Sequence, residues 1–444
     1  MRRKLFALLM SLVMVLAMGA TASATVGTSL DENGEAGAFS TDGSPESKSK
    51  ILVLEKELTA YNPDGSTVNA PEITFNYAIA GATLPATDTT VTDNKNVTAP
   101  VKTGVGAPTI TASISWANTE TLTTSATGTA NKKSIEVDFT GVDFGATGIY
   151  RYVISETVTD PEISGVTPGS SRTRYVDVYV RASEAFSTAS DAGKWDIYGY
   201  TCFINNEAVI TEANKAATPV KTTGFVAHDD GTTVTPADSY YTFNLTVSKT
   251  VTGDAYGAAN NQFPFTVLFT NDTATKNFDI IGAATGTVTW TEPAAGTIAG
   301  ASGVVSMKSG SSVTYTGIPC GTSVEVYETN TATGVTYKVQ STLTKGATAG
   351  TPVVDDAVSA GTAPTTAAAQ GATKAVYQST KVEVGTEKDK TSDSYTIAVE
   401  NIFLTISPTG IVLRYAPYAL VLIGGMLLLF LGWKFIRREQ NEEA

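Results

Sequence analysis

The sequence predicts an all-β protein made of two tandem β-sandwich domains. Short runs of alternating apolar and polar residues recur through the chain, and Gly, Pro, Asn and Asp separate them. No long stretch has helical periodicity, and the chain between its two apolar ends is long enough for two domains of ordinary size, or for three. We therefore expect one domain over residues 50–232 and a second over residues 240–404.

The N-terminal end predicts secretion. Arg2, Arg3 and Lys4 precede an apolar run at residues 5–18, and Ala22-Ser23-Ala24 follows. This order is typical of a signal peptide with its cleavage site, so residues 1–24 are excluded from the fold. Residues 25–49 are rich in Gly, Ser, Thr, Asp and Glu and contain little that could be buried, which predicts a disordered leader.

The C-terminal end, residues 405–444, predicts a membrane segment. Ser407-Pro408-Thr409-Gly410 comes first, an uncharged apolar run at residues 416–433 follows, and Lys434, Arg437 and Arg438 come last. A run of this length can hold a chain in a bilayer, and the basic residues lie where the cytoplasm is expected. Without a further signal, the segment is a plain membrane anchor.

The order of these C-terminal features resembles the cell-wall sorting signal of Gram-positive surface proteins. The resemblance implies that a sortase cuts between Thr409 and Gly410 and joins Thr409 to an amine. The chain is then in the membrane only before cleavage. Ser407 departs from the usual Leu-Pro-x-Thr-Gly order, in which a leucine stands before the proline.

Composition excludes several functions. The formal net charge of −13 argues against nucleic-acid binding and suits a soluble surface protein. The chain has one histidine, His228, and lacks metal-ligand spacings and phosphate-binding glycine loops, so we expect no cofactor, no metal and no enzyme. Cys202 and Cys320 fall in different halves, either as two buried thiols or as an inter-domain bridge.

Each half places a lysine on the apolar face of its first strand. Strand side chains alternate between faces, so Lys56 shares a face with Leu52, Leu54 and Leu58. Lys249 likewise follows Leu245 and Val247. Burial of an unpaired ammonium is costly, and two lysines in matching places therefore require a partner.

A carboxylate with the same inward pattern appears later in each half. Glu156 follows Tyr152 and Ile154, and Glu328 follows Val324 and Val326. The last strand of the second half places Asn401 on a face with Ile397 and Val399. The first-half counterpart is Asp229, on a face with Phe225 and Ala227, and it follows Glu156 by as many residues as Asn401 follows Glu328.

A buried Lys, Glu and Asn or Asp can form an isopeptide bond. Burial lowers the pKa of a lysine and raises that of a glutamate, and a neutral amine is a nucleophile. A protonated Glu can polarise the side-chain carbonyl and relay protons. The resulting amide joins the first strand of a domain to the last, so that tension bypasses the core. Otherwise Lys56 and Glu156 form an ordinary ion pair, or Lys56 reaches the surface.

Both halves resemble the isopeptide-linked domains of the streptococcal T-antigen (FctA-like) backbone pilins. The similarity lies in short segments in a fixed order: residues 73–75, 148–156 and 175–180 in the first half, and residues 245–253, 263–265, 317–319, 326–328 and 399–401 in the second. The resemblance implies immunoglobulin-like, CnaB-type sandwiches. It also implies that Lys249 bonds Asn401 with help from Glu328, and that Lys56 and Glu156 act likewise, with Asp229 where the family has Asn.

The resemblance further implies partners and a location. The partners are a sortase, other copies of the chain, other pilins or peptidoglycan, and a host or bacterial surface ligand, with the chain on the cell surface. Lys221 lies where the family's intersubunit linking lysine falls, and Lys215 is a nearby competitor. The favoured role is the backbone subunit of a pilus. The alternative is a wall-anchored adhesin or basal pilin with Thr409 joined directly to peptidoglycan.

Overall fold

A computed structural model of the chain describes most of both predicted domains. The residues described are 27–37, 47–84, 90–92, 98–159, 163–183, 195–204, 206, 209–210, 220–229, 234–253, 262–270, 281–285, 288–292, 302–329, 337–346, 348–349, 353–358, 376–378, 382–384, 394–403, 418 and 420–434. The signal peptide, the sorting motif Ser407 to Gly410, and Lys215 lie outside these ranges.

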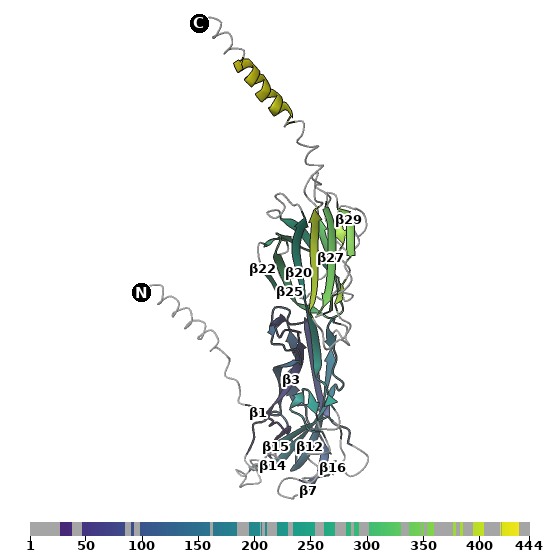
Figure 1. The fold of residues 1–444 in the computed structure, drawn as a ribbon. Helices are drawn as coiled ribbons and strands as arrows, with labels where there is room; N and C mark the ends of the chain where they lie inside the picture. The colour runs from purple at the N-terminus through teal and green to yellow at the C-terminus, as the bar shows by residue number, and fades with distance from the viewer. Residues whose placement is uncertain are drawn as a thin grey trace, which may run out of the picture.

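The described chain folds into two β-sandwiches stacked end to end, which confirms the predicted all-β class (Figure 1). The first contains β1 (Thr28–Ser29), β2 (Glu35–Ala36), β3 (Ile51–Tyr61), β4 (Val68–Asn69), β5 (Ile73–Gly81), β6 (Thr90–Thr92), β7 (Thr98–Thr103), β8 (Thr109–Ile110), β9 (Ser113–Trp116), β10 (Thr121–Leu122), β11 (Thr129–Asp138), β12 (Gly148–Val158), β13 (Val166–Thr167), β14 (Thr173–Ala182), β15 (Trp195–Phe203), β16 (Val209–Ile210), β17 (Gly224–Phe225), β18 (His228–Asp229) and β19 (Val234–Thr235).

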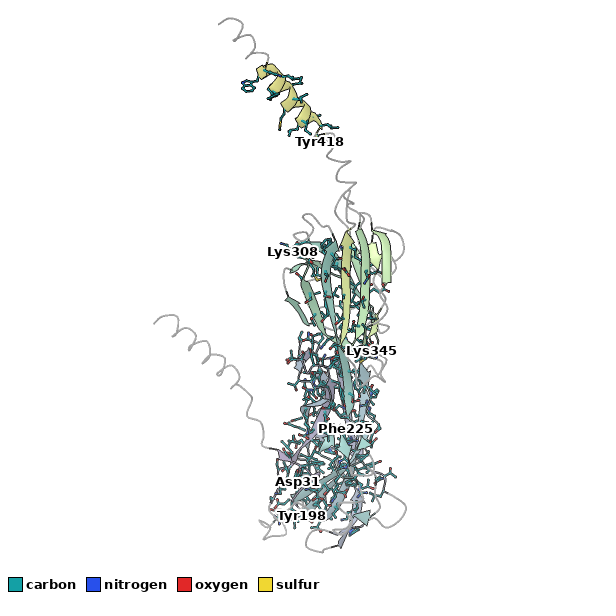
Figure 2. All side chains as sticks on the ribbon, in the orientation of Figure 1. Asp31, Tyr198, Phe225, Lys308, Lys345 and Tyr418 are labelled. Carbon is teal, nitrogen blue, oxygen red and sulfur yellow. The ribbon has the colours of Figure 1, made fainter. Side chains whose placement is uncertain are left out.

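The strand β20 (Asp238–Gly253) joins the two domains. The second domain continues with β21 (Phe263–Thr270), β22 (Ile281–Thr285), β23 (Val288–Glu292), β24 (Ser302–Met307), β25 (Ser311–Pro319), β26 (Thr322–Thr329), β27 (Tyr337–Lys345), β28 (Thr348–Ala349), β29 (Val353–Val358), β30 (Val376–Gln378), β31 (Val382–Val384) and β32 (Tyr395–Phe403). Figure 2 shows side chains filling both sandwiches, with Phe225 in the first and Lys308 in the second.

One sheet extends through both domains because β20 belongs to each. Its first residues, Asp238 to Tyr241, pair in parallel with Leu58 to Tyr61 of β3. Its later residues pair in parallel with β32 and antiparallel with β25. The central order of this sheet is therefore β32-β20-β3-β11. The strand β20 therefore begins inside the first domain and continues into the second.

In both domains, alternate residues of the first strand are buried in the core. In β3, Leu52, Leu54 and Leu58 are fully buried beside Lys56, and in β20 Leu245 and Val247 are fully buried beside Lys249. Full burial of one such apolar side chain contributes about 1.5–3 kcal/mol. The predicted inward faces of the two first strands are confirmed, and each lysine is fixed inside by the apolar residues on either side of it.

Part of the predicted disordered leader is folded. Residues 27–37, here called the N-terminal strap, carry β1, which pairs in parallel with β3, and β2, which pairs antiparallel with β15. A turn closes between them, where Asp31 N donates to Glu35 O at 2.8 Å and Gly34 N donates to Asp31 O at 3.0 Å. The expectation of disorder is wrong for this segment because its polar residues find partners on the domain surface.

The C-terminal described segment is helical over residues 420–434, and its apolar side chains are exposed; Figure 2 labels Tyr418 beside it. Within the part of the chain that the structure describes, no helix is both long enough and apolar enough to span a membrane. Cys202 and Cys320 are both buried free thiols, one in each core, so the inter-domain bridge is not formed.

Candidate functional site: two buried lysine clusters

The second-domain cluster joins three buried side chains from three strands. Lys249 comes from β20, Glu328 from β26 and Asn401 from β32. Lys249 Nζ donates to Glu328 Oε2 at 3.0 Å, and Asn401 Nδ2 donates to Glu328 Oε1 at 2.6 Å. Each of the three side chains is at most 1% exposed. The structure therefore brings together the three residues that the sequence predicted.

Burial makes Lys249 a better nucleophile than an ordinary lysine. Its Nζ lies 4.7 Å from the ring centroid of Phe263 and has little access to water. Burial disfavours the ammonium and lowers the pKa of Lys249 to about 8, although Glu328 pulls that pKa upward. A larger fraction of this amine than of an ordinary lysine is therefore neutral near neutral pH, and the neutral form is the one that attacks a carbonyl.

The carbonyl oxygen of the Asn401 carboxamide is an unsatisfied hydrogen-bond acceptor within the described part of the chain. Asn401 Oδ1 is buried and has no hydrogen-bond partner among the residues that the structure describes. A buried carbonyl oxygen without a hydrogen-bond donor costs free energy. In the sheet, Lys249 lies opposite Val399, and Asn401 lies opposite Val251, two residues further along β20.

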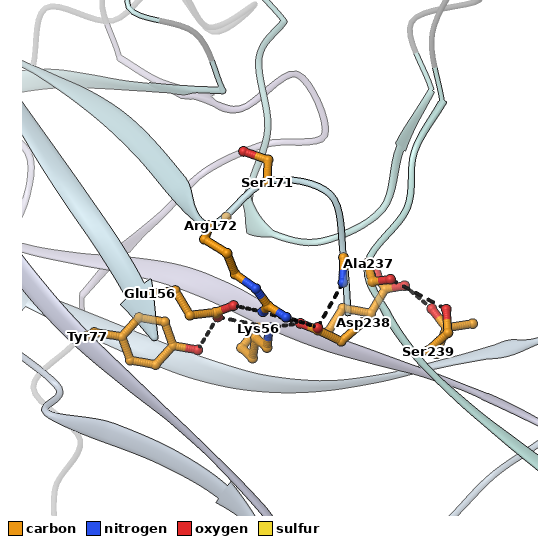
Figure 3. Close-up of polar contacts among 12 residues, drawn as sticks. Lys56, Tyr77, Glu156, Ser171, Arg172, Ala237, Asp238 and Ser239 are labelled. Carbon is orange, nitrogen blue, oxygen red and sulfur yellow. Dashed lines mark hydrogen bonds and ion pairs between the residues drawn. The ribbon is translucent and has the colours of Figure 1, made fainter. Parts of the chain in front are cut away.

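The first-domain cluster repeats this arrangement around Lys56 (Figure 3). Lys56 Nζ lies 2.8 Å from Glu156 Oε2 and also pairs with Asp238 Oδ2. The Nζ stands 3.8 Å from the ring centroid of Phe75, much as Lys249 stands over Phe263. Lys56, Glu156 and Asp238 are each no more than 3% exposed.

The partner of Lys56 is Asp238, not Asp229. The sequence prediction fails because a short hairpin, β18 with β19, lies between β17 and β20. The strand β17 reaches Lys56, with Phe225 opposite it, but Ala227 beyond it is exposed and Asp229 pairs with β19. The chain returns as β20 and places Asp238 in the position that β17 leaves open.

The two clusters share one register. Asp238 lies opposite Leu58, two residues after Lys56, and Asn401 lies opposite Val251, two residues after Lys249. In both domains the acceptor strand is parallel to the lysine strand. This match in geometry is stronger than the match in sequence spacing, and it identifies Asp238 as the counterpart of Asn401.

The first cluster contains two groups that the sequence did not predict. Arg172 precedes β14 and binds both acids: its Nη1 contacts Glu156 Oε1, its Nη1 donates to Asp238 Oδ2 at 2.9 Å, and its Nη2 donates to Asp238 Oδ1 at 2.5 Å. Tyr77 donates its hydroxyl proton to Glu156 Oε2 at 2.9 Å. Figure 3 shows Arg172 reaching between Glu156 and Asp238.

These charges set the electrostatics of the first cluster. Burial by itself would raise the pKa of Asp238, but Lys56 and Arg172 hold that pKa below its ordinary value. The same pairing with Asp238 and Glu156 raises the pKa of Arg172 although burial opposes it. Burial and the adjacent Glu156 raise the pKa of the Tyr77 hydroxyl, so that Tyr77 remains a donor.

Lys221, the predicted linking lysine, is buried rather than free. It is 7% exposed and forms an ion pair with Glu35 of the N-terminal strap. The strap lies directly on the chain beyond Lys221: a Cβ on Gly34 would lie 2.5 Å from Thr222 N. Gly34 has φ of +71°, a conformation that favours glycine. The amine is therefore sealed by the strap in this state.

Solved structures that are similar to this chain include streptococcal major pilins. The chain is similar to the structure of the major pilin protein (T3.2) from Streptococcus pyogenes serotype GAS13637, with 19% identity, a TM-score of 0.42, and coverage of 80% of this chain and 99% of that one. A second S. pyogenes major pilin has 15% identity and a TM-score of 0.41, with coverage of 79% and 98%.

Other matches are shorter. A pilus-presented adhesin, Spy0125 (Cpa), has 16% identity and a TM-score of 0.21, with coverage of 53% of this chain and 37% of the adhesin. A family described as "Domain of unknown function (DUF7601)" matches residues 243–363. No curated protein matches the chain. The two major pilins belong to the family that the sequence resembles.

Proposed function

We propose that this chain is a structural subunit of a sortase-assembled pilus on a Gram-positive cell surface, stabilised by self-formed isopeptide bonds. The observation that carries the proposal is the repeated cluster: a buried lysine, a buried glutamate and an amide or carboxyl acceptor, in one register, in both domains. A catalyst needs a substrate cavity beside such groups, whereas these clusters are closed inside sandwich cores.

In the second domain, Lys249 is the nucleophile and Asn401 the acceptor. Lys249 Nζ attacks Asn401 Cγ, Glu328 relays protons, and ammonia leaves as the amide forms. The reaction converts a buried amine with a depressed pKa and a buried carbonyl without a partner into one neutral amide. In the first domain, Lys56 and Asp238 form the corresponding amide with loss of water, assisted by Glu156.

The two bonds give the chain a continuous covalent path. They connect β3 to β20 and β20 to β32, three neighbouring strands of the shared sheet. Force along this path bypasses residues 57–237 and 250–400, which contain most of both cores. A subunit that carries load in a surface fibre requires this property, and a secreted catalyst does not.

Assembly uses the two ends of the molecule. A sortase cuts after Thr409 and joins it to Lys221 of the next copy, which releases the chain from the membrane. Lys221 must first leave Glu35, so the N-terminal strap has to open before the amine can react. Other pilins, peptidoglycan and a host or bacterial surface ligand remain the further partners in this proposal.

A second role has one observation in its favour. Because the strap seals Lys221, the free subunit offers no accessible amine at that position. A wall-anchored adhesin or basal pilin would need none there, since Thr409 would be joined directly to peptidoglycan. Lys215, which lies outside the described residues, is the alternative acceptor for a shaft subunit.

The two roles differ in their products. Co-expression of the chain with a pilin-class sortase in a Gram-positive host should give a ladder of multimers that resists boiling in SDS. Lys221→Arg should reduce the ladder to monomer while leaving both intramolecular bonds intact, and Lys132→Arg, at an exposed lysine of the same domain, should leave the ladder unchanged. A single cell-wall species in every variant would favour the adhesin or basal role.

A further inference from the structure

Both carboxylate oxygens of Asp238 are held by donors. Asp238 Oδ1 accepts from Arg172 Nη2 at 2.5 Å and from the Gly169 backbone N–H at 2.9 Å. Asp238 Oδ2 faces Lys56 Nζ and accepts from Arg172 Nη1 at 2.9 Å. The acceptor carbon thus lies between an oxygen fixed by two donors and an oxygen that faces the nucleophile.

The second domain lacks this arrangement. Within the described ranges, Asn401 Oδ1 has no donor, and the Asn401 amide group is already a neutral acceptor with ammonia as its leaving group. A carboxylate is a poorer electrophile than a carboxamide because its negative charge repels an incoming lone pair. Bond formation at Asp238 therefore needs stabilisation of additional negative charge, which two fixed donors can provide.

We propose that Arg172 and the Gly169 N–H form an oxyanion-binding pair that makes the Lys56–Asp238 bond possible. This proposal rests on the bond formation proposed above. It assigns to Arg172 a catalytic role in a reaction that the protein performs once on itself. The same side chain also contacts Glu156, so one guanidinium orients both acids of the cluster.

The steps balance without another reactant. Glu156 Oε2, 2.8 Å from Lys56 Nζ, takes one ammonium proton, and the neutral amine attacks Asp238 Cγ. A C–N bond forms, and the charge that gathers on Oδ1 is held by Gly169 N–H and Arg172. Glu156 returns its proton to Oδ2, a second proton passes from the nitrogen to Oδ2, and the C–Oδ2 bond breaks. Water leaves with two of the three ammonium protons, and the third stays on the amide.

The backbone at Gly169 is shaped for this contact. A Cβ added there would lie 2.9 Å from Pro236 O and 3.2 Å from Ala237 C, so a larger residue would push the segment away from β20. Arg172 is anchored on the other side, because its carbonyl accepts the Glu156 backbone N–H at 2.9 Å. Its side chain is 27% exposed, so that a small solute can reach the guanidinium position.

The test is intact mass with peptide mapping of the secreted ectodomain. The wild type should lose one ammonia at Lys249–Asn401 and one water at Lys56–Asp238. Arg172→Ala should lose the ammonia only, with the water loss slowed roughly 100-fold, the size of effect expected for one oxyanion donor. Arg181→Ala, at an arginine near the far end of β14, the strand that follows Arg172, should behave as the wild type.

Chemical rescue separates catalysis from folding. Millimolar guanidinium should restore the water loss in Arg172→Ala, which a merely structural defect would not allow. Gly169→Ala should slow the water loss as well, while the ammonia loss continues. The inference is overturned if Arg172→Ala loses water at the wild-type rate, or if the wild type retains a free Lys56 amine. Absence of the ammonia loss in the wild type would instead overturn the proposed function.

Discussion

Asp238 and Lys249 lie on the same strand, β20, one at the acceptor position of the first cluster and one at the nucleophile position of the second. At about 3.3 Å per residue they are roughly 35 Å apart along the strand. One continuous β-strand therefore connects the two proposed bonds, with no flexible linker between them. The load path runs from Lys56 across to Asp238, along β20 to Lys249, and across to Asn401.

Single-molecule pulling from the two ends of the ectodomain tests this path. The wild type should show no domain-unfolding event, because both cores lie outside the covalent path. Asn401→Ala should release residues 250–400 as one event of about 50 nm, at the chain length expected per extended residue. A wild type that unfolds with extensions of this size would contradict the load path.

Loss of the second-domain bond should also lower equilibrium stability. The bond closes a loop of the length of the whole domain, and a covalent closure of such a loop stabilises by about 4–5 kcal/mol in the chain-entropy view. Asn401→Ala and Glu328→Ala should both lower the free energy of unfolding of the second domain by this order, and neither should show a loss of ammonia from its calculated mass. Urea unfolding and intact mass together check it. Thr396→Ala, on the same strand but away from the cluster, serves as a control.

The depressed pKa of Lys249 predicts a pH dependence when the bond cannot form. In Asn401→Ala, the folded pKa of about 8 lies below the ordinary value of 10.5, so the unfolded chain binds more protons between these two values. Stability should therefore rise with pH across this window, by about 3 kcal/mol in total. Urea unfolding from pH 7 to 10.5 measures it. A flat profile, equal to that of Lys249→Met with Asn401→Ala, would contradict the prediction.

The Arg151–Asp177 pair should dominate the stability of the first domain. Arg151 Nε and Nη2 donate to the two Asp177 oxygens at 2.7 and 2.9 Å, and both side chains are fully buried opposite each other on β12 and β14. Arg151→Met should cost about 3–5 kcal/mol because it leaves a buried carboxylate unpaired. Asp177→Leu added to it should recover most of that loss in urea unfolding. If the losses of unfolding free energy were additive in the double variant, the two side chains would not stabilise the domain as a pair.

The N-terminal strap should control the reactivity of Lys221. Glu35→Gln removes the charge that pairs with the ammonium and should raise acylation of Lys221 by a small amine-reactive ester roughly tenfold, since a hydrogen bond to a charged group contributes about 1.5–3 kcal/mol. Peptide mass mapping reads the modified lysine. Lys132, whose side chain is 44% exposed, should react at the same rate in both proteins. Equal rates at Lys221 would show that the strap does not limit access.

The local sequence pattern was sufficient to predict which strand side chains face the core. Lys56 and Lys249 could be placed inside because strand side chains alternate and their apolar neighbours must be buried, and Glu156, Glu328 and Asn401 follow from the same rule. These residues belong to regular strands, where a face is set by residues two positions away. Nothing beyond the neighbouring sequence is needed to know which way such a side chain points.

The sequence could not identify Asp238, because that requires knowing which strand neighbours β3. The residue spacing from Glu156 predicts Asp229 as the acceptor. The hairpin of β18 and β19 adds residues to that spacing, so that Asp238 instead occupies the acceptor position beside β3. A partial sequence signal did exist: the alternating run that contains Lys249 extends back to Tyr241, three residues after Asp238. Which residue of that strand lies beside Lys56 is decided by pairing between strands that are distant in sequence.

The sequence by itself determined the all-β class, the two lysine faces and the three residues of the second cluster, because these depend on local periodicity. Only the tertiary structure decided that Asp238 faces Lys56, that Arg172 and Gly169 hold its carboxylate, and that the strap seals Lys221. Each of those contacts joins loops or strand ends from distant parts of the chain. Loops and strand ends carry no periodic pattern, so their partners are fixed only when the sheets assemble.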